Sequence, residues 1–252
     1  QPVEQVGQAA RYAHPGEVVL SAAAWAVLRD RGDGKPLSHG CQRLDELCPL
    51  PPCAAPALAL RTEMAEAMRV YLPGAVRARL AAGHDAWLGE LRRITVLFLN
   101  LPDVHYATSI TDAQRIMRAL QATLYRYEGS VNKLSVDDKG VTMVAALGLA
   151  PLAHEDDPVR GVQAAMAMQE ALRGMGLRWA IGVTTGRVFC GMIGNAARQE
   201  YTIIGDAVNL AARLMQVARG DLLCDSATMQ AVRGRFPFDT LPPITVKGKA
   251  EP

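Results

Sequence analysis

From residue 94 onward, the spacing of hydrophobic residues alternates between that of buried strands and that of amphipathic helices. Ile94–Asn100 is apolar without alternation, which predicts a strand covered on both faces. Thr111–Tyr127 has the spacing of a helix, with Ile116, Leu120 and Leu124 on one face. The pattern therefore predicts a buried strand followed by a helix that packs its apolar face against a core.

The next stretch predicts a hairpin and a second helix. Ser130–Val136 and Val141–Leu147 read as strands, and Asp137–Gly140 (DDKG) between them is typical of a tight hairpin turn. Asp157–Arg173 has helical spacing, with proline in its first turn and glycine placed to end it.

A second hairpin is predicted from Trp179–Thr184 and Val188–Ile193, turning at Thr185–Gly186. A short strand, Tyr201–Ile204, then leads through Gly205 into a helix that begins at Asp206. The last predicted elements are Leu222–Asp225, a short helix, and terminal strands near Phe236 and at Ile244–Val246.

The predicted order from residue 92 to 252 is β-α-β-β-α-β with βαβ-type additions. This order predicts an α+β fold of the ferredoxin-like (split βαβ) kind, with a mixed sheet and helices packed on one face. Many unrelated functions use this fold, so the fold by itself assigns none.

The first part of the chain has a different composition. Residues 1–62 predict a strand at Glu17–Leu20, a helix capped by Ser21, a turn at Gly32–Gly34 and a weak strand at Gln42–Leu47. The run Pro49–Ala57 (PLPPCAAPA) reads as a boundary, because proline-rich sequence fits neither a helix nor a central strand. Residues 63–91 then read as a helical linker with one break at Pro73.

Composition excludes several classes of function. The formal net charge is +2 with no dense basic cluster, which argues against a nucleic-acid face. No run reaches the ~18 apolar residues of a membrane span, and no signal peptide opens the chain. Five cysteines without CxxC spacing argue against structural zinc and a disulfide framework, so we expect a cytoplasmic protein. Because residue 1 is not methionine, we interpret the chain as part of a longer polypeptide.

The helix from Asp206 to Val217 carries its polar residues on one stripe: Asp206, Asn209, Arg213 and Gln216. Asn209 and Arg213 are one turn apart, so an amide and a guanidinium project into the same space, where they could hold a sugar and a phosphate. The alternative is a stripe that simply faces solvent on an amphipathic helix.

Lys133 and Thr202 are the candidates for recognising a purine. A lysine pointing inward from a central strand needs a partner, and Thr202 is expected one strand away in the same sheet. Lysine only donates hydrogen bonds, whereas threonine donates or accepts, and together they suit the acceptor nitrogens and amino group of adenine. The alternative is a Lys133 that faces solvent.

The second part of the sequence resembles the class III nucleotidyl cyclase catalytic domain. The resemblance rests on VNK, EYTIIGDAVNLAARL, the upstream GVTTGRVFCGMIGN and the terminal ITVKGKAEP, and it covers roughly residues 92–252. ELRRITVLFLNLP, VNKLSVDDKG and AHEDDPVRGVQAAMAM make the chain most similar to the second catalytic domain of soluble adenylyl cyclase and its bacterial multidomain relatives. Residues 1–62 resemble the tail of a first cyclase domain.

The resemblance implies a role for each candidate residue. Lys133 and Thr202 match the residues that recognise adenine, Asn209 matches the asparagine that orients the ribose, and Arg213 matches the arginine that stabilises the transition state. In this family, ATP becomes 3′,5′-cyclic AMP and pyrophosphate in a cleft between two cyclase domains. The opposite domain supplies two aspartates that hold two Mg²⁺ or Mn²⁺ ions.

Two departures from the family pattern predict that this domain holds no metal. Asn100 stands where the first metal aspartate is expected, and a neutral amide is a poor ligand for a hard divalent ion. Asp137 has the family's spacing from Lys133, but Asp137 and Asp138 are expected to be turn residues. The resemblance therefore implies the nucleotide-binding half of a pseudo-heterodimer, completed by a preceding cyclase domain and inactive by itself.

Other interpretations stay open. A non-catalytic nucleotide-binding or regulatory domain would keep the purine pocket without turnover, and a purely structural domain would keep neither. Guanylyl cyclase activity is disfavoured by Lys133. His154, with Glu155, Asp156 and Asp157, could suggest a metal site, but this run fits better the N-terminus of a helix, where carboxylates interact favourably with the dipole.

Overall fold

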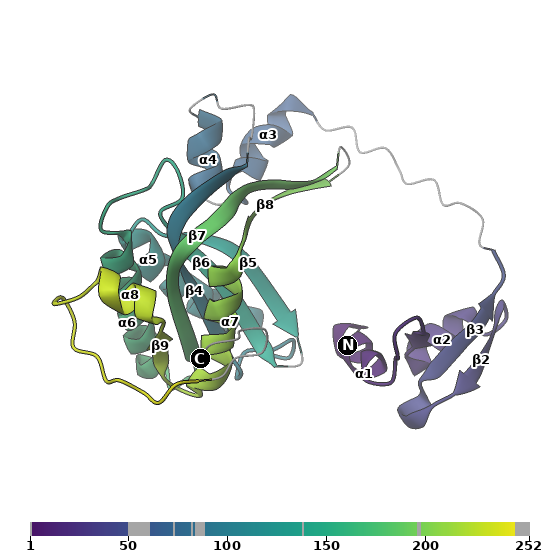
Figure 1. Cartoon of the computed structure of the whole chain (residues 1–252). Helices are drawn as coiled ribbons and strands as arrows, with labels where there is room; N and C mark the ends of the chain where they lie inside the picture. Colours follow the sequence, from purple (N-terminus) through teal and green to yellow (C-terminus); the bar gives the residue numbers. More distant parts are fainter. Residues whose placement is uncertain are drawn as a thin grey trace. The chain divides into compact units, whose positions relative to one another are not determined.

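The structure is a computed structural model that describes residues 2–49, 61–72, 74–81, 83, 89–137, 139–195 and 198–244. The chain divides into two compact units, 1–61 and 62–252, and each is described by itself (Figure 1). The proline-rich boundary lies almost entirely outside the described residues.

The first unit is a three-stranded antiparallel sheet with short helices. Its elements are α1 (Pro2–Ala10), β1 (Val18–Leu20), α2 (Ala22–Leu28), β2 (Gly32–Pro36), a 3₁₀ turn η1 (Ser38–Gly40) and β3 (Gln42–Leu47). The strand order is β1-β3-β2. The predicted cap is confirmed, because the Ser21 side chain accepts a hydrogen bond from the Ala24 N–H at 3.2 Å.

The predicted turn at Gly32–Gly34 is wrong. These residues begin β2 and pair with β3, and a Cβ on Gly34 would meet the Trp25 ring at 3.3 Å. Glycine is used here because the Arg43 main-chain oxygen of β3, 2.7 Å from such a Cβ, and the Trp25 ring both lie against the strand. Among the described residues of this unit, only Ala9 and Cys41 are buried hydrophobic residues, so the unit has almost no core of its own.

The second unit contains one mixed sheet and its helices. Its elements are α3 (Thr62–Arg69), α4 (Gly74–Ala81), β4 (Glu90–Leu101), α5 (Ile110–Arg126), β5 (Ser130–Asp137), β6 (Gly140–Leu147), α6 (Asp157–Gly174), β7 (Ala180–Asn195), β8 (Arg198–Ile204), α7 (Asp206–Ala218), β9 (Leu222–Cys224) and α8 (Ser226–Ala231). The strand order is β5-β6-β4-β7-β8, and β9 pairs with β7 in parallel. The predicted α+β class is confirmed.

The sheet has a core on each face, which corrects the expectation of helices on one face only. Residues such as Leu97 and Leu99 of β4 pack with α5 and α6 in one buried cluster. The alternate residues Ile94 and Val96 lie in a second cluster with Ala211 of α7 (Figure 1). Both faces of β4 are covered, as its continuous apolar run predicted.

The predicted hairpin turn at Thr185–Gly186 is also wrong. β7 runs without interruption through both residues, with Thr185 opposite Thr95 and Gly186 opposite Ile94. The reversal comes later, where Asn195 pairs with Arg198. Glycine is favoured at position 186 because a Cβ there would lie only 2.9 Å from the Cβ of Ala207 in α7.

Other boundaries differ in smaller ways. β4 starts at Glu90, so the end of the predicted linker is strand. Residues around Phe236 form no strand, and most of the predicted strand at Ile244–Val246 lies outside the described residues. The strand β3 and the hairpin of β5 and β6 are confirmed.

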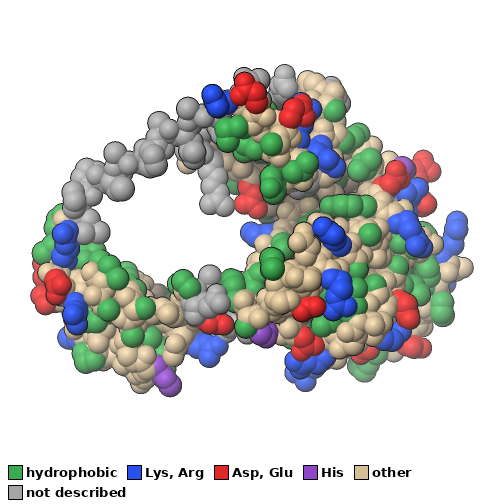
Figure 2. Space-filling view, turned by 180° about the vertical axis from the view of Figure 1, so that it is seen from behind, with side chains coloured by type: hydrophobic (Ala, Val, Ile, Leu, Met, Phe, Trp, Pro, Cys, Tyr) green, Lys and Arg blue, Asp and Glu red, His purple; other side chains and the backbone are tan. Residues whose placement is uncertain are grey.

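Charged side chains of both signs lie on the described surface. Figure 2 shows basic and acidic side chains interspersed over the described part of the face it presents. In the part of the chain that the structure describes, no helix is both long and apolar enough to cross a membrane.

Candidate nucleotide site

The helix α7 lies directly on β7 because small residues separate them. A Cβ on Gly182 would be 2.2 Å from the Ala211 oxygen and 2.6 Å from the Met215 nitrogen, so only glycine allows this approach. Beside it, the buried Thr184 donates its hydroxyl to the Ala207 oxygen at 2.7 Å. These contacts fix the position and rotation of the helix on the sheet.

The polar stripe predicted for α7 points away from β7. Asp206, Asn209 and Gln216 are exposed and Arg213 is half-buried, whereas Ala211 and Leu214 are buried. Asn209 and Arg213 are thus held one turn apart on a helix whose opposite side is locked to the sheet. The structure brings these two predicted residues together.

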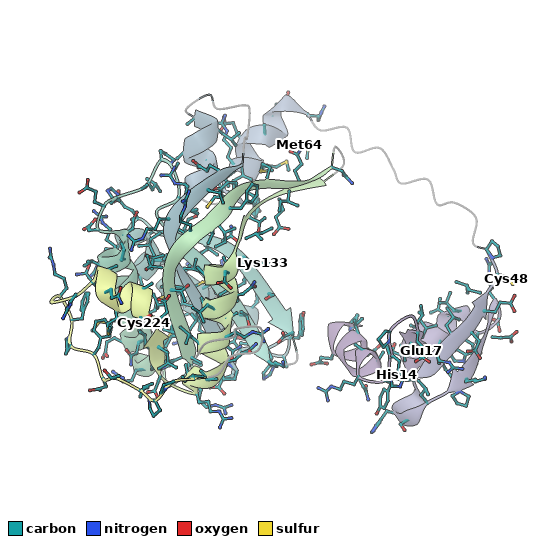
Figure 3. All side chains as sticks on the ribbon, viewed as in Figure 1. His14, Glu17, Cys48, Met64, Lys133 and Cys224 are labelled. Atoms are coloured by element: carbon teal, nitrogen blue, oxygen red, sulfur yellow. The ribbon has the colours of Figure 1, made fainter. Side chains whose placement is uncertain are left out.

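The sequence suggested that Lys133 points inward from a central strand, and this prediction is wrong. β5 is the last strand at one end of the sheet, and Lys133 is exposed (Figure 3). Lys133 lies opposite Val144, which belongs to the cluster beneath α7. Its side chain therefore projects from the same face of the sheet as α7.

Thr202 is not one strand away from Lys133 in the sheet order. It lies on β8, at the other end, with β6, β4 and β7 between. The two end strands nevertheless meet, because the Asn132 side-chain amide donates to the Tyr201 oxygen at 3.3 Å. Tyr201 and Ile203 pack beneath α7, so the alternate residue Thr202 turns its side chain to the other surface of β8.

All four predicted side chains are free to bind a ligand. Among the described residues, no hydrogen bond or ion pair holds the side chains of Lys133, Thr202, Asn209 or Arg213. Two cations and an amide are therefore available to a ligand. A phosphate would suit the guanidinium, and a ring nitrogen would suit the ammonium.

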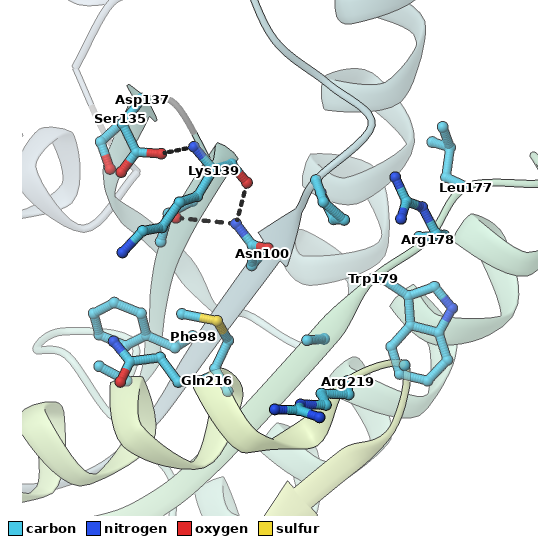
Figure 4. A pocket seen from close by; sticks show the side chains of 16 residues that line it. Phe98, Asn100, Ser135, Asp137, Lys139, Leu177, Arg178, Trp179, Gln216 and Arg219 are labelled. Carbon is cyan, nitrogen blue, oxygen red and sulfur yellow. Dashed lines mark hydrogen bonds between the residues drawn. The ribbon is translucent and has the colours of Figure 1, made fainter. Parts of the chain in front are cut away.

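Asn100 does not fit a metal site. Its amide nitrogen donates to the main-chain oxygens of Lys139 and Val141 at 3.3 Å each and to the Thr142 hydroxyl at 3.4 Å. Figure 4 shows this amide beside the β5–β6 hairpin. The main-chain oxygens of Lys139 and Val141 accept hydrogen bonds from this amide. An aspartate at position 100 would place its carboxylate oxygen against these oxygens and would be repelled.

Asp137 lies in the hairpin turn, and Asp157 begins α6. Asp137 accepts the Lys139 N–H at 2.8 Å within the hairpin turn, as predicted. Asp157, the first residue of α6, accepts the His154 N–H at 2.8 Å, and burial raises the pKa of this carboxyl. Within the described residues, no three His, Cys, Asp or Glu side chains gather as a metal would require.

A separate hollow of about 930 Å³ lies beside this region. It is bounded by the C-terminal half of α7 and by residues at the ends of β4, β5 and β6, including Phe98, Asn100, Ser135, Thr142 and Gln216 (Figure 4). None of the four predicted nucleotide residues lines it. The hollow adjoins the polar stripe of α7, because Gln216 belongs to both.

Sequence reasoning missed two residues that shape the site. Asn132 connects the end strands, and its only signal was a polar residue directly before Lys133. Gly182 allows α7 to approach, and its only signal was a glycine inside a predicted strand.

Comparison with known proteins identifies the family of this chain. The model of the adenylate and guanylate cyclase catalytic domain family matches residues 89–252. Human adenylate cyclase type 10 is 33% identical over 173 residues, which covers 66% of this chain and 11% of that protein. The chain thus spans about a tenth of the length of that curated relative.

Two solved cyclases have a similar fold. The adenylyl cyclase CyaB from P. aeruginosa has a TM-score of 0.58 and 24% identity, covering 66% of this chain and 92% of that one. The guanylyl cyclase Cya2 has a TM-score of 0.54 and 25% identity, covering 64% and 88%. With a family match over more than half its length, this chain belongs to the adenylate and guanylate cyclase catalytic domain family.

Proposed function

We propose that this domain is the nucleotide-binding half of an adenylate cyclase, which converts ATP to 3′,5′-cyclic AMP and pyrophosphate together with a metal-binding partner domain. The main observation in support is that the side chains of Asn209 and Arg213 have no hydrogen-bond or ion-pair partner among the described residues. They lie on a helix that is held against the sheet by the close contact at Gly182 and the hydrogen bond from Thr184. Preorganised donors of this kind stabilise charge that develops in a transition state.

Each residue has a chemical role in the proposed reaction. The ribose 3′-oxygen forms a bond to the α-phosphorus, its proton passes to solvent, and the bond from that phosphorus to the pyrophosphate oxygen breaks. Arg213 donates to the oxygens on which negative charge builds. Asn209, one turn earlier, donates to or accepts from the ribose and orients the attacking oxygen.

Adenine rather than guanine is favoured by the charge of Lys133. An ammonium group only donates hydrogen bonds, and adenine offers ring nitrogens that accept them. Guanine would call for an acidic acceptor for its ring N–H and amino group. Thr202 is proposed as a second contact from β8, although its side chain leaves that strand on the surface opposite Ile203. The similarity to human adenylate cyclase type 10 supports the same substrate.

The partner is proposed to be a cyclase domain that precedes this one in the same polypeptide. Residues 1–62 support this proposal, because their sequence resembles the tail of a first cyclase domain. That domain would hold the Mg²⁺ or Mn²⁺ ions, since Asn100 and Asp137 are engaged within this one.

The proposal is tested by assaying the polypeptide with and without the preceding domain. We expect the longer polypeptide to convert ATP with Mg²⁺ or Mn²⁺ to cyclic AMP, identified by mass spectrometry. The chain described here should be inactive when assayed alone. Robust activity from residues 1–252 by themselves would contradict the half-site, and cyclic GMP as the main product would contradict the adenine assignment. Nucleotide binding without turnover in the longer polypeptide would favour a regulatory domain.

A further inference from the structure

β5 contains one extra residue directly before Lys133. Val131 lies opposite Ala145 and Lys133 lies opposite Val144, so Asn132 is the extra residue of a β-bulge. Val131 packs into the core beneath α5 and α6, on the face opposite α7. Without the bulge, strict alternation would place Lys133 on that same face as Val131. The bulge therefore turns Lys133 toward the α7 side.

The same residue joins the two ends of the sheet. The Asn132 amide nitrogen donates to the Tyr201 main-chain oxygen at 3.3 Å, across 69 residues of sequence. β5 and β8 are the end strands of the order β5-β6-β4-β7-β8, so no main-chain ladder pairs them. This side-chain bond ties the residue before Lys133 to the residue before Thr202.

We propose that Asn132 is a positioning residue for purine selection: it sets the face from which Lys133 projects and holds Lys133 at a fixed place beside β8. This inference rests on the proposed function, since it concerns how the ATP site is built. The residue type follows from the geometry. The Tyr201 oxygen accepts a hydrogen bond, so an amide nitrogen suits it, whereas an aspartate oxygen would be repelled.

The experiment uses the polypeptide that includes the preceding cyclase domain. Asn132→Ala removes the donor, and Asn132→Leu removes it while keeping a side chain of similar bulk. Loss of one such hydrogen bond should raise KM for ATP about threefold to tenfold. The ratio of kcat/KM for ATP to that for GTP should fall, while kcat should stay within about twofold because Arg213 is untouched. Leu134→Ala is the control, because Leu134 is 45% exposed and lies on the other face of the same strand.

A double-mutant cycle shows whether Asn132 acts through Lys133. If it does, Asn132→Ala should change KM little once Lys133→Ala is present, because the group it positions is gone. Full additivity, or an unchanged ATP preference in folded Asn132→Ala and Asn132→Leu, would overturn the inference. If Leu134→Ala had as large an effect as Asn132→Ala, the effect would come from general destabilisation of β5. This outcome would also overturn the inference.

Failure of the proposed function has a different signature. In that case Lys133→Ala itself would leave ATP binding and preference unchanged. If Lys133→Ala weakens ATP use and Asn132→Ala does not, the adenine assignment stands and only the positioning role is lost.

Discussion

Gly182 of β7 lies directly beneath Ala211 of α7, and a Cβ on Gly182 would come within 2.2 Å of the Ala211 oxygen. We expect Gly182→Ala to push the helix away from the sheet and to destabilise the fold by about 1–3 kcal/mol, the usual range for overpacking. Because Asn209 and Arg213 move with the helix, cyclase activity of the longer polypeptide should fall more than stability alone explains. Thermal denaturation and activity at a temperature where the variant is folded would measure the two effects.

Gly174→Ala is the matched control for that substitution. Gly174 ends α6, and a Cβ there would meet no atom within 4 Å. Alanine at this position should be neutral or stabilising by up to about 1 kcal/mol. A Gly182→Ala variant as stable and active as Gly174→Ala would show that α7 does not depend on this contact.

Arg213→Ala should lower kcat of the longer polypeptide by about 100-fold, with KM for ATP changed by less than about threefold. The guanidinium is proposed to act on charge that appears only in the transition state. Arg118→Ala, on the exposed side of α5, removes an equal charge from the opposite face and should have no effect. Equal losses in nucleotide binding and in turnover would contradict the role proposed for Arg213.

Lys133→Glu should reduce the preference for ATP over GTP by at least about tenfold, because a carboxylate accepts the hydrogen bonds that guanine donates. Thr202→Ala should have the smaller effect, since the Thr202 side chain leaves β8 on the surface opposite Ile203. Competition kinetics with both nucleotides would measure both variants. If Thr202→Ala shifted the preference more than Lys133→Glu, then Thr202 would be the main adenine contact.

Much of this fold could be predicted from local patterns. The doubly covered β4, the amphipathic α5 and the hairpin before Gly140 all follow from side-chain periodicity and turn residues. The hairpin placed at Thr185–Gly186 failed because a glycine can signal a turn or a close helix, and only the position of Ala207 distinguishes them. The sequence alone could not supply that tertiary contact.

The candidate site could likewise be predicted only in part from the sequence. The stripe with Asn209 and Arg213 follows from helical spacing, and its orientation away from β7 agrees with the pattern. The relation between Lys133 and Thr202 did not follow, because the approach of the end strands depends on a side-chain bond from Asn132. The bulge that turns Lys133 toward α7 leaves no periodic signal in eight residues of strand.

Asn100→Asp should destabilise the domain by about 1–3 kcal/mol at neutral pH, because the new oxygen would face the carbonyl oxygens of Lys139 and Val141. Asn100→Ala, which loses the same bonds without adding charge, should be less affected. Neither variant should bind Mn²⁺, measured by calorimetry on the isolated chain. A stable Asn100→Asp variant that bound Mn²⁺ tightly would show that this domain needs only one substitution to become a metal-binding half.

The loop before α5 is tied to the loop before β7 by Asp103 and Arg178, and this link should make stability depend on pH. The Asp103 carboxylate accepts the Arg178 main-chain N–H and the Arg178 Nε–H, each at 2.8 Å. The side-chain hydrogen bonds from Arg178 hold the pKa of Asp103 below its ordinary value. A carboxyl whose pKa is lower in the folded state stabilises that state above its unfolded pKa, and the stabilisation is lost as pH falls through the folded pKa.

Asp103→Asn should therefore lower Tm at pH 7 by no more than about 3 °C, since Arg178 is largely exposed to solvent and Asp103 is partly exposed. The difference from the unsubstituted chain should shrink as the pH falls below about 4, where the carboxyl of the unfolded chain becomes protonated. Thermal denaturation from pH 3 to pH 7 would measure it, with Arg118→Ala as a charge control. A difference that stayed constant over this range would mean that Asp103 contributes through packing and not through its charge.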